Sequence, residues 1–191
     1  MLLDLSSAFD TVDHETLLNV LNHWLLIDEP PLKWLRSYLT ACTQVFSVNG
    51  AESASLPVDC SVPQGSVLGP IQFISYTEDV TVIFDTHKLR HHLFADDKQR
   101  YSSVTVLDIN KAKSTLVLCV ADVQDWCASR RLQLNASKTE VIRMGTRQRL
   151  QQLMGVDLSL TIDSVVIKPL KVVRDLGVFI DEELTFKQHV V

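Results

Sequence analysis

Two strand-like segments, residues 89–95 and 99–106, flank the adjacent aspartates Asp96 and Asp97. Their composition and alternation predict two antiparallel strands joined by an acidic turn. Chance alone gives about one Asp-Asp pair in a chain of this composition, so the pair by itself indicates no chemistry. A third carboxylate nearby would change that, because carboxylates within about 4 Å repel by a few kcal/mol unless a cation is bound.

Asp4 is the candidate for this third carboxylate. It lies in the apolar segment 1–5, which predicts a buried strand. If that strand lies beside the hairpin, Asp4 and Asp96 project from neighbouring strand ends into one small volume. Oxygen-only ligands select Mg²⁺ or Mn²⁺, and two such ions about 3.5–4 Å apart activate a hydroxyl and stabilise a leaving phosphate. The alternative is that Asp4 caps a helix and Asp96-Asp97 forms a solvated turn.

The remaining elements mix helices and strands without a regular parallel rhythm. Apolar spacing of three and four residues predicts helices over residues 14–26, 32–39, 66–84 and 108–127. Alternation and turn residues predict strands over residues 43–50, 53–62, 139–145, 158–167 and 172–180, with a hairpin at Asn49-Gly50. This mixture predicts an α+β fold rather than a doubly wound α/β fold.

Composition restricts the class of protein. The longest clear apolar run, residues 116–121, is far shorter than the 18 or so residues of a membrane span. The four cysteines show no C-x-x-C spacing, which favours reduced thiols and an intracellular protein, in the nucleus or the cytoplasm. The net charge of -5 argues against a free-standing nucleic-acid binder, which usually carries a basic surface.

Five blocks of the chain occur in the order and approximate spacing of reverse transcriptases. They read LDLSSAFDTVDH, SVPQGSVLGP, FADD, LQLNASKTE and VVRDLGVFID. From Leu2 to about His189 the chain most closely resembles the enzymes of non-long-terminal-repeat (non-LTR), LINE-like retrotransposons. The first three blocks are highly specific as an ordered set. The resemblance implies RNA-directed DNA polymerase activity and a polymerase palm, an α+β fold whose antiparallel sheet, a ferredoxin-like core, packs on helices.

The resemblance also implies a set of catalytic residues. Asp4 and Asp96 resemble the two metal-binding aspartates, and Asp97 resembles their acidic partner. With two Mg²⁺ or Mn²⁺ ions, the primer 3′-hydroxyl would attack the α-phosphorus of a deoxynucleoside triphosphate (dNTP). Lys138 resembles a lysine that assists pyrophosphate departure, and a solvated surface lysine is an equally consistent interpretation.

Further positions resemble residues that contact the substrates. Phe9 resembles the steric gate, a ring beneath the incoming sugar that would clash with a 2′-hydroxyl, and a core phenylalanine is the alternative. Gln64 and Gly65 resemble the loop that contacts the incoming nucleotide and the template, where glycine permits close backbone approach. Leu176 and Gly177 resemble the hairpin that grips the primer end, with a plain structural hairpin as the alternative.

The sequence departs from the family pattern in three places. Lys98 and Arg100 stand where a small hydroxyl and an apolar residue are common, and an ammonium beside the carboxylates competes with metal. Gln72 and Glu78 make the helix after LGP more polar than is usual. Cys42 stands where a basic residue is common.

We therefore expect residues 1–191 to be a partial reverse transcriptase domain, a palm that ends near the primer-gripping hairpin. Fingers and thumb regions would belong to a longer parent polyprotein. The implied partners are an RNA or DNA template, a DNA primer and a dNTP, without a membrane. We expect this fragment to be inactive alone, with its first strand exposed at a sheet edge.

Two alternatives use the same residues differently. The first is a non-catalytic remnant, or a co-opted interaction domain, that retains the palm fold. The second is a two-metal nuclease or phosphatase, which is less favoured because it gives no role to the PQGSVLGP segment. A chain that both binds metal and extends a primer would be a polymerase, and neither alternative predicts this combination.

Overall fold

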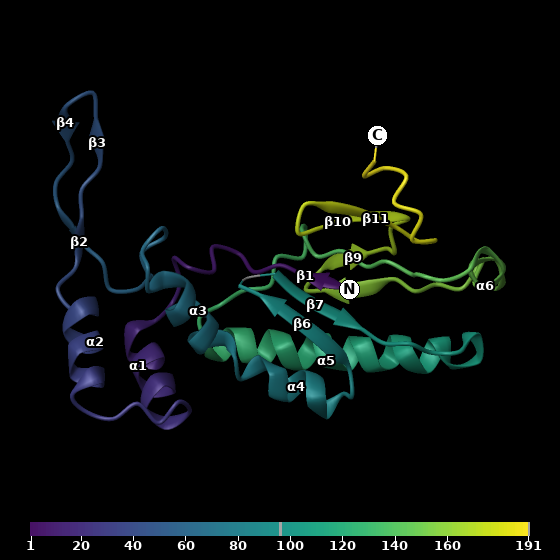
Figure 1. Ribbon diagram of the computed structural model, residues 1–191, viewed down its shortest axis with the longest axis horizontal. Coiled ribbons are helices and arrows are strands. Elements are labelled where there is room, and N and C mark those ends of the chain that lie inside the picture. The colour runs from purple at the N-terminus through teal and green to yellow at the C-terminus, as the bar shows by residue number, and fades with distance from the viewer. Residues whose placement is uncertain (96, 191) are drawn as a thin grey trace. The chain divides into compact units, whose positions relative to one another are not determined.

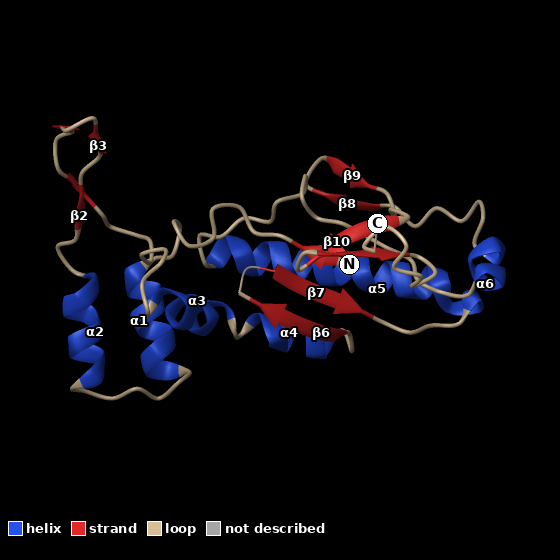
Figure 2. Cartoon of the chain, turned by 45° about the horizontal axis from the view of Figure 1, so that its top comes forward, coloured by secondary structure: helices blue, strands red, loops and turns tan. Residues whose placement is uncertain are grey.

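The computed structural model of the chain describes residues 1–95 and 97–190, and these residues form two compact units. The sheet unit contains residues 1–6, 80–127 and those from 133 onward. The helical unit contains residues 7–79 and 128–132. Figure 1 labels the elements in chain order, and Figure 2 colours them by type.

The sheet unit is built on a three-stranded antiparallel sheet in the order β1-β7-β6. Its strands are β1 (Leu2–Leu3), β6 (Arg90–Phe94) and β7 (Asp97–Tyr101). The hairpin predicted around the paired aspartates is therefore present, and its second strand pairs with β1. The register is Leu2 opposite Gln99 and Leu3 opposite Lys98.

The first strand is not an open sheet edge, so the expected exposed edge was wrong. On the side away from β7, the Leu2 amide donates to the Glu140 carbonyl at 2.8 Å. The Glu140 amide donates back to the Leu2 carbonyl at 2.9 Å. Both edges of β1 are thus hydrogen-bonded, which removes the template for pairing with another chain.

Two helices lie against one face of this sheet (Figures 1 and 2), α4 (Val80–Thr86) and α5 (Ile109–Ser129). The long helix predicted from residue 108 is α5. Its buried side chains in the sheet unit, Cys119, Val120, Val123 and Cys127, follow helical spacing. All four cysteines are free thiols in the structure.

The rest of the sheet unit consists of two hairpins and one short helix. The hairpins are β8 (Leu160–Ile162) with β9 (Val165–Ile167), and β10 (Val172–Asp175) with β11 (Val178–Asp181). The short helix α6 (Arg147–Gln152) was not predicted. The strand predicted over residues 139–145 forms only isolated bridges, at Glu140 and Ile142.

The helical unit has three helices and a long exposed hairpin. The helices are α1 (His14–His23), α2 (Pro31–Leu39) and α3 (Gly69–Thr77). The hairpin pairs β2 (Thr43–Gln44) with β5 (Leu56–Pro57), and β3 (Ser47–Val48) with β4 (Ala51–Glu52). Asn49 and Gly50 form its turn with φ of 50° and 83°, as the Asn-Gly pair predicts.

One predicted helix is two helices in the structure. The segment 66–84 is divided between α3 and α4 by a turn at Glu78-Asp79. The Asp79 carboxylate pairs with Arg130, a partner that no local pattern indicates. Just before α3, the Ser66 hydroxyl accepts a hydrogen bond from the amide of Gly69, the first residue of the helix, at 2.9 Å.

The described residues therefore form an α+β protein of helices and small antiparallel sheets, which confirms the predicted fold class. Within the described part of the chain, no helix is long and apolar enough to cross a membrane. The helical unit buries Val12, Leu17, Val62, Phe73 and Tyr76 completely.

Candidate active site

The pairing of β1 with β7 brings two predicted site residues together. The register places Asp4 level with Asp97, one step beyond the pair of Leu3 and Lys98. Directly opposed residues of an antiparallel pair project on the same face of the sheet. Both aspartates line a cavity of about 330 Å³. Asp96 lies outside the described residues, so its predicted role as metal ligand stays a prediction.

Four segments far apart in sequence line this cavity. They are β1 with Asp4, the start of β7, the loop that contains Lys138, and the turn end of the β10–β11 hairpin. The acidic and basic residues that line it are Asp4, Asp97, Glu140, Asp175, Lys98, Lys138 and Arg174. Lys138 and Leu176, both predicted site residues, thus share the cavity with the aspartates.

Lys138 lies beside the Asp4 carboxylate. Its Nζ is 3.9 Å from the Asp4 Oδ2, while the lysine side chain is 71% exposed and the aspartate 20%. The loop is held in place because the Asn135 amide donates to the Asp4 carbonyl at 2.9 Å. An ion pair this exposed contributes little to stability, so the ammonium can leave Asp4 for a phosphate at small cost.

The donor set suits a hard divalent cation. Carboxylate oxygens are the ligands that Mg²⁺ and Mn²⁺ prefer, and Mg²⁺ typically takes one or two carboxylates together with substrate phosphates. Asp4 and Asp97 provide two on one face of the sheet. Among the residues that the structure describes, no three His, Cys, Asp or Glu side chains gather into a metal site. The remaining predicted carboxylate, Asp96, lies outside the described residues.

Leu176 and Gly177 form the turn of the β10–β11 hairpin. Their φ angles are 45° and 87°, so both residues occupy the left-handed region that two-residue hairpin turns require. For a leucine this conformation is uncommon and costs energy. The Leu176 side chain is about half exposed and lines the cavity.

Lys98 and Arg100 project from the opposite face of β7 and are each 1% exposed. The Lys98 Nζ donates to the Ala95 carbonyl at 3.4 Å. The Arg100 guanidinium lies 2.9 Å from the centre of the Phe84 ring, and burial lowers its pKa to about 9. The sequence marked both residues as departures from the family but did not predict that they are buried beneath the acidic face.

The predicted substrate residues Phe9, Gln64 and Gly65 lie in the helical unit. The Phe9 ring is half-buried and stacks on Phe73, with 4.5 Å between ring centroids and 19° between planes. The Val62 amide donates to the Phe9 carbonyl at 2.9 Å. The Gln64 Nε2 donates to the Asp10 carboxylate at 3.2 Å. These contacts join the first two sequence blocks within the helical unit.

The structure gives glycine at position 65 a conformational reason, and its predicted contact with the substrates stays a prediction. A Cβ built on Gly65 meets nothing within 4 Å, but the backbone has φ of +80°, which favours glycine. Glycine is thus needed there for the backbone conformation and not for close approach within the chain. Close approach occurs at Gly69, where a Cβ would lie 2.7 Å from the Pro63 carbonyl oxygen.

Residues 1–174 match the model of a protein family described as reverse transcriptase (RNA-dependent DNA polymerase). The chain belongs to the reverse transcriptase family.

Relatives from mobile elements confirm the more specific resemblance. The chain is 29% identical over 195 residues to the probable RNA-directed DNA polymerase from transposon BS of Drosophila melanogaster. It is 28% identical over 196 residues to the RNA-directed DNA polymerase from the mobile element jockey of the same species. Each alignment covers 98% of this chain, so the sequence resemblance to enzymes of LINE-like elements is confirmed. The chain spans about 20% of the length of these relatives.

Gln99 and Asp175 are among the cavity residues of this family member that the sequence analysis missed. Gln99 follows Asp97 by two residues in β7 and therefore shares its face, so strand alternation could have found it. Asp175 immediately precedes the Leu176-Gly177 turn, but no local pattern indicates that it reaches β7.

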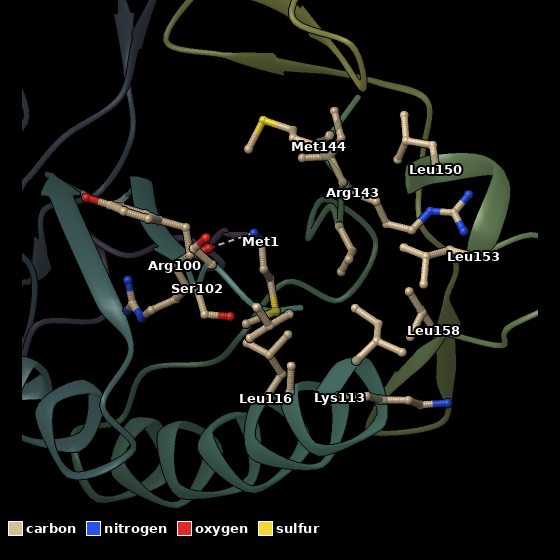
Figure 3. Close-up of a pocket in the computed structure, with 18 of the residues that line it drawn as sticks. Met1, Arg100, Ser102, Lys113, Leu116, Arg143, Met144, Leu150, Leu153 and Leu158 are labelled. Atoms are coloured by element: carbon tan, nitrogen blue, oxygen red, sulfur yellow. Dashed lines mark hydrogen bonds between the residues drawn. The ribbon is translucent and has the colours of Figure 1, made fainter. Parts of the chain in front are cut away.

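A second, larger cavity of about 460 Å³ lies in the sheet unit of this reverse transcriptase-family chain (Figure 3). Its labelled apolar walls come from Leu116, Leu150, Leu153 and Leu158. The Met1 amine donates to the Arg100 carbonyl at 2.8 Å, and burial lowers the pKa of this amine to about 6. None of the predicted catalytic or substrate residues that the structure describes lines this cavity.

Proposed function

We propose that the chain is the palm of a LINE-like reverse transcriptase and takes part in RNA-directed DNA synthesis. One observation carries the proposal: the cavity beside β1 and β7 is lined by Asp4, Asp97, Lys138 and Leu176, which come from four separate segments. The sequence motifs alone assign a polymerase role to each of these four residues. A solvated turn or a plain surface lysine gives no reason for them to share a cavity.

We further propose how these residues act. Asp4, Asp96 and Asp97 hold two Mg²⁺ or Mn²⁺ ions, which, when bound, lower the barrier to attack by the primer 3′-hydroxyl. The acidic face excludes the triphosphate until this charge is neutralised. Lys138 then moves from Asp4 to the leaving phosphate, a shift that its exposure allows. The Leu176-Gly177 turn contacts the primer end.

The helical unit would recognise the nucleotide in this proposal. Phe9 presents a ring edge to the sugar and excludes a 2′-hydroxyl. Its stacking on Phe73 fixes the plane of that ring. Gln64 and Gly65 contact the nucleotide and the template.

We also propose that residues 1–191 are a partial domain with a ferredoxin-like palm core. Its partners would be an RNA or DNA template, a DNA primer and a dNTP, with the fingers and thumb regions supplied by a parent polyprotein. The 20% share of the relatives supports this division of labour. Positioning of the triphosphate supplies much of the rate in phosphoryl transfer, so the chain alone should extend primers poorly.

Primer extension on an RNA template with Mg²⁺ or Mn²⁺ tests the proposal. The chain is compared with a longer polypeptide that carries an upstream fingers region. We expect extension by the longer polypeptide only, with loss of activity in Asp96→Asn and unchanged activity in the control Asp125→Asn, an exposed residue of α5. Extension that survives Asp96→Asn would contradict the metal mechanism. Robust extension by the short chain would contradict its dependence on the missing regions.

The buried cations favour one second candidate, a non-catalytic palm. Lys98 and Arg100 place positive charge directly beneath the acidic face, where it competes with metal. A remnant of this kind would keep the fold and bind neither Mn²⁺ nor a primed template in the longer polypeptide.

A further inference from the structure

One side-chain contact joins the acidic strand to the neighbouring hairpin. The Gln99 Nε2 donates to both carboxylate oxygens of Asp175, at 2.8 and 2.9 Å. Gln99 lies in β7 and Asp175 ends β10, and both side chains are half-buried. Hydrogen bonds to an ionised acceptor are shorter and stronger than neutral ones, so this contact holds its partners closely.

Gln99 and Asp175 each lie close in sequence to a residue of the candidate site. Gln99 is two residues after Asp97 and shares its face, while Asp175 directly precedes the Leu176-Gly177 turn. Both line the cavity that contains Asp4. A single contact therefore connects the carboxylate face to the wall that Leu176 contributes.

The contact between Gln99 and Asp175 does not follow from direct backbone pairing of their two strands. Among the described residues, β10 and β11 pair only with each other. Their nearby backbone bonds run to other segments, as where the Gly145 amide donates to the Glu182 carbonyl at 2.9 Å. Over the residues described, no backbone hydrogen bond ties β10–β11 to β1, β6 or β7. The backbone reaches β1 indirectly at the base of the hairpin, where the Leu170 amide donates to the Val141 carbonyl at 2.7 Å and Glu140 pairs with Leu2. At the other end of the hairpin, the contact between Gln99 and Asp175 links the turn to β7 directly.

We propose that Gln99 and Asp175 are positioning residues, which set the distance between the Leu176-Gly177 turn and the carboxylate face. The proposal rests on the proposed function, in which this turn contacts the primer and the carboxylates hold the metals. Displacement of a reacting group by about 1 Å is enough to lower a rate about 100-fold. The amide at position 99 is required as a donor, since a carboxylate there would repel Asp175.

An exchange of the two side-chain types tests this inference. Gln99→Glu alone places two carboxylates against each other, and Asp175→Asn alone weakens the contact by removing the charged acceptor. The double variant Q99E/D175N restores a donor and an acceptor in reversed order with the original net charge. The matched control is Gln124→Glu, because the Gln124 Nε2 also donates to an aspartate, Asp163, at 2.8 Å but outside the cavity.

The first readout needs no catalysis and uses the chain of residues 1–191. We expect amide hydrogen exchange in β10 and β11 to be at least tenfold faster in Q99E and to return to within about threefold of wild type in the double variant. Exchange in α5, with circular dichroism, reports whether each variant is folded. If Q99E unfolds the whole chain, Asp175→Asn replaces it in this comparison. Unchanged exchange in both single variants would overturn the inference.

The second readout is primer extension by the longer polypeptide. We expect Q99E to lower kcat about tenfold to 100-fold with little change in the dNTP KM, the double variant to recover most of this loss, and Q124E to match wild type. Altered exchange with unaltered kcat would overturn the positioning role. If the unmutated longer polypeptide fails to extend primers, the proposed function fails, and the exchange data still support or overturn the link between the hairpins.

Discussion

The helical unit and the sheet unit both contain largely buried charged side chains, but the partners of these side chains differ. In the helical unit the charges are paired: Arg130 with Asp79, and Arg131 with Asp13 at 2.7 Å. The Tyr76 hydroxyl adds a bond to the Arg130 carbonyl at 2.5 Å. Arg130, Asp79 and Asp13 are 13%, 11% and 13% exposed, and each has a partner of opposite sign, although Arg131 itself is largely exposed.

In the sheet unit the most deeply buried charges are the cations Lys98 and Arg100, which donate hydrogen bonds to the carbonyls of Ala95 and Gln99 at 3.4 and 2.6 Å. Arg100 lies on the Phe84 ring, and Cys119 and Cys127 lie near Arg100 and Lys98. Burial raises the pKa of these thiols to about 11 and 12, so at neutral pH they are uncharged and do not neutralise the cations. The helical unit thus pairs the Arg130 guanidinium with a carboxylate, whereas in the sheet unit the Arg100 guanidinium lies on an aromatic ring and its burial costs stability.

The largest predicted effect is in the helical unit. Asp79→Ala should lower the free energy of unfolding by about 3–5 kcal/mol, because it leaves the Arg130 guanidinium buried without its partner. Urea unfolding measures this change. The exposed control Asp125→Ala should stay within about 0.5 kcal/mol of wild type. A loss below about 1 kcal/mol in Asp79→Ala would remove the contrast between the units.

Phe9→Ala should have a smaller effect on stability and a selective one on chemistry. A fully buried phenylalanine loses about 3–5 kcal/mol on truncation, so the half-buried Phe9 should lose about 1–2 kcal/mol. In the longer polypeptide the variant should keep deoxynucleotide use and admit ribonucleotides more readily. Thermal unfolding and misincorporation assays measure the two effects. A larger loss of stability with unchanged sugar preference would indicate a core residue.

Arg100→Met should change stability in the opposite direction from Asp79→Ala. With a pKa of about 9 the guanidinium is still charged at pH 7, so the fold bears the cost of burying it. A methionine of similar length should raise the free energy of unfolding by about 1 kcal/mol, because it packs against Phe84 without that cost. The measurement is urea unfolding at pH 7. A clear loss of stability would show that the contact with the ring outweighs burial.

The smallest effect concerns thiol reactivity and leaves stability unchanged. Only the thiolate reacts, and each pKa unit above the ambient pH lowers its population about tenfold. At pH 8, Cys119 should therefore react about 100-fold more slowly than an ordinary thiol, and Cys127 more slowly still. Cys42 and Cys60, which are not fully buried, should be labelled first. Mass spectrometry after timed alkylation gives the order.

Local pattern predicted most of the elements and the central strand pairing. Strand alternation gave the β6–β7 hairpin, apolar spacing gave α1, α2 and α5, and the Asn49-Gly50 turn followed from its sequence. Where the prediction failed, a distant partner decides the structure. Arg130 accompanies the break between α3 and α4, and Glu140 covers the edge of β1.

The sequence predicted which residues belong to the candidate site, but it did not predict the contacts that surround them. The motifs identified Asp4, Lys138 and Leu176, which the structure places in one cavity. The burial of Arg100 depends on Phe84, and the contact of Gln99 depends on Asp175, 76 positions later in the chain. Residue type and spacing carry no information about such pairings until the strands are placed.

The central claim is that Asp4 and the hairpin carboxylates form one divalent metal site. Mn²⁺ titration of the chain, followed by electron paramagnetic resonance, tests it directly, with the Mn²⁺-dependent rise in melting temperature as a second readout. We predict saturable binding that weakens at least tenfold in Asp4→Asn and in Asp96→Asn and is unchanged in Asp125→Asn. Asp96→Asn should also be slightly more stable than wild type without metal, because it relieves carboxylate repulsion. Equal Mn²⁺ affinity in wild type and Asp4→Asn would contradict the claim.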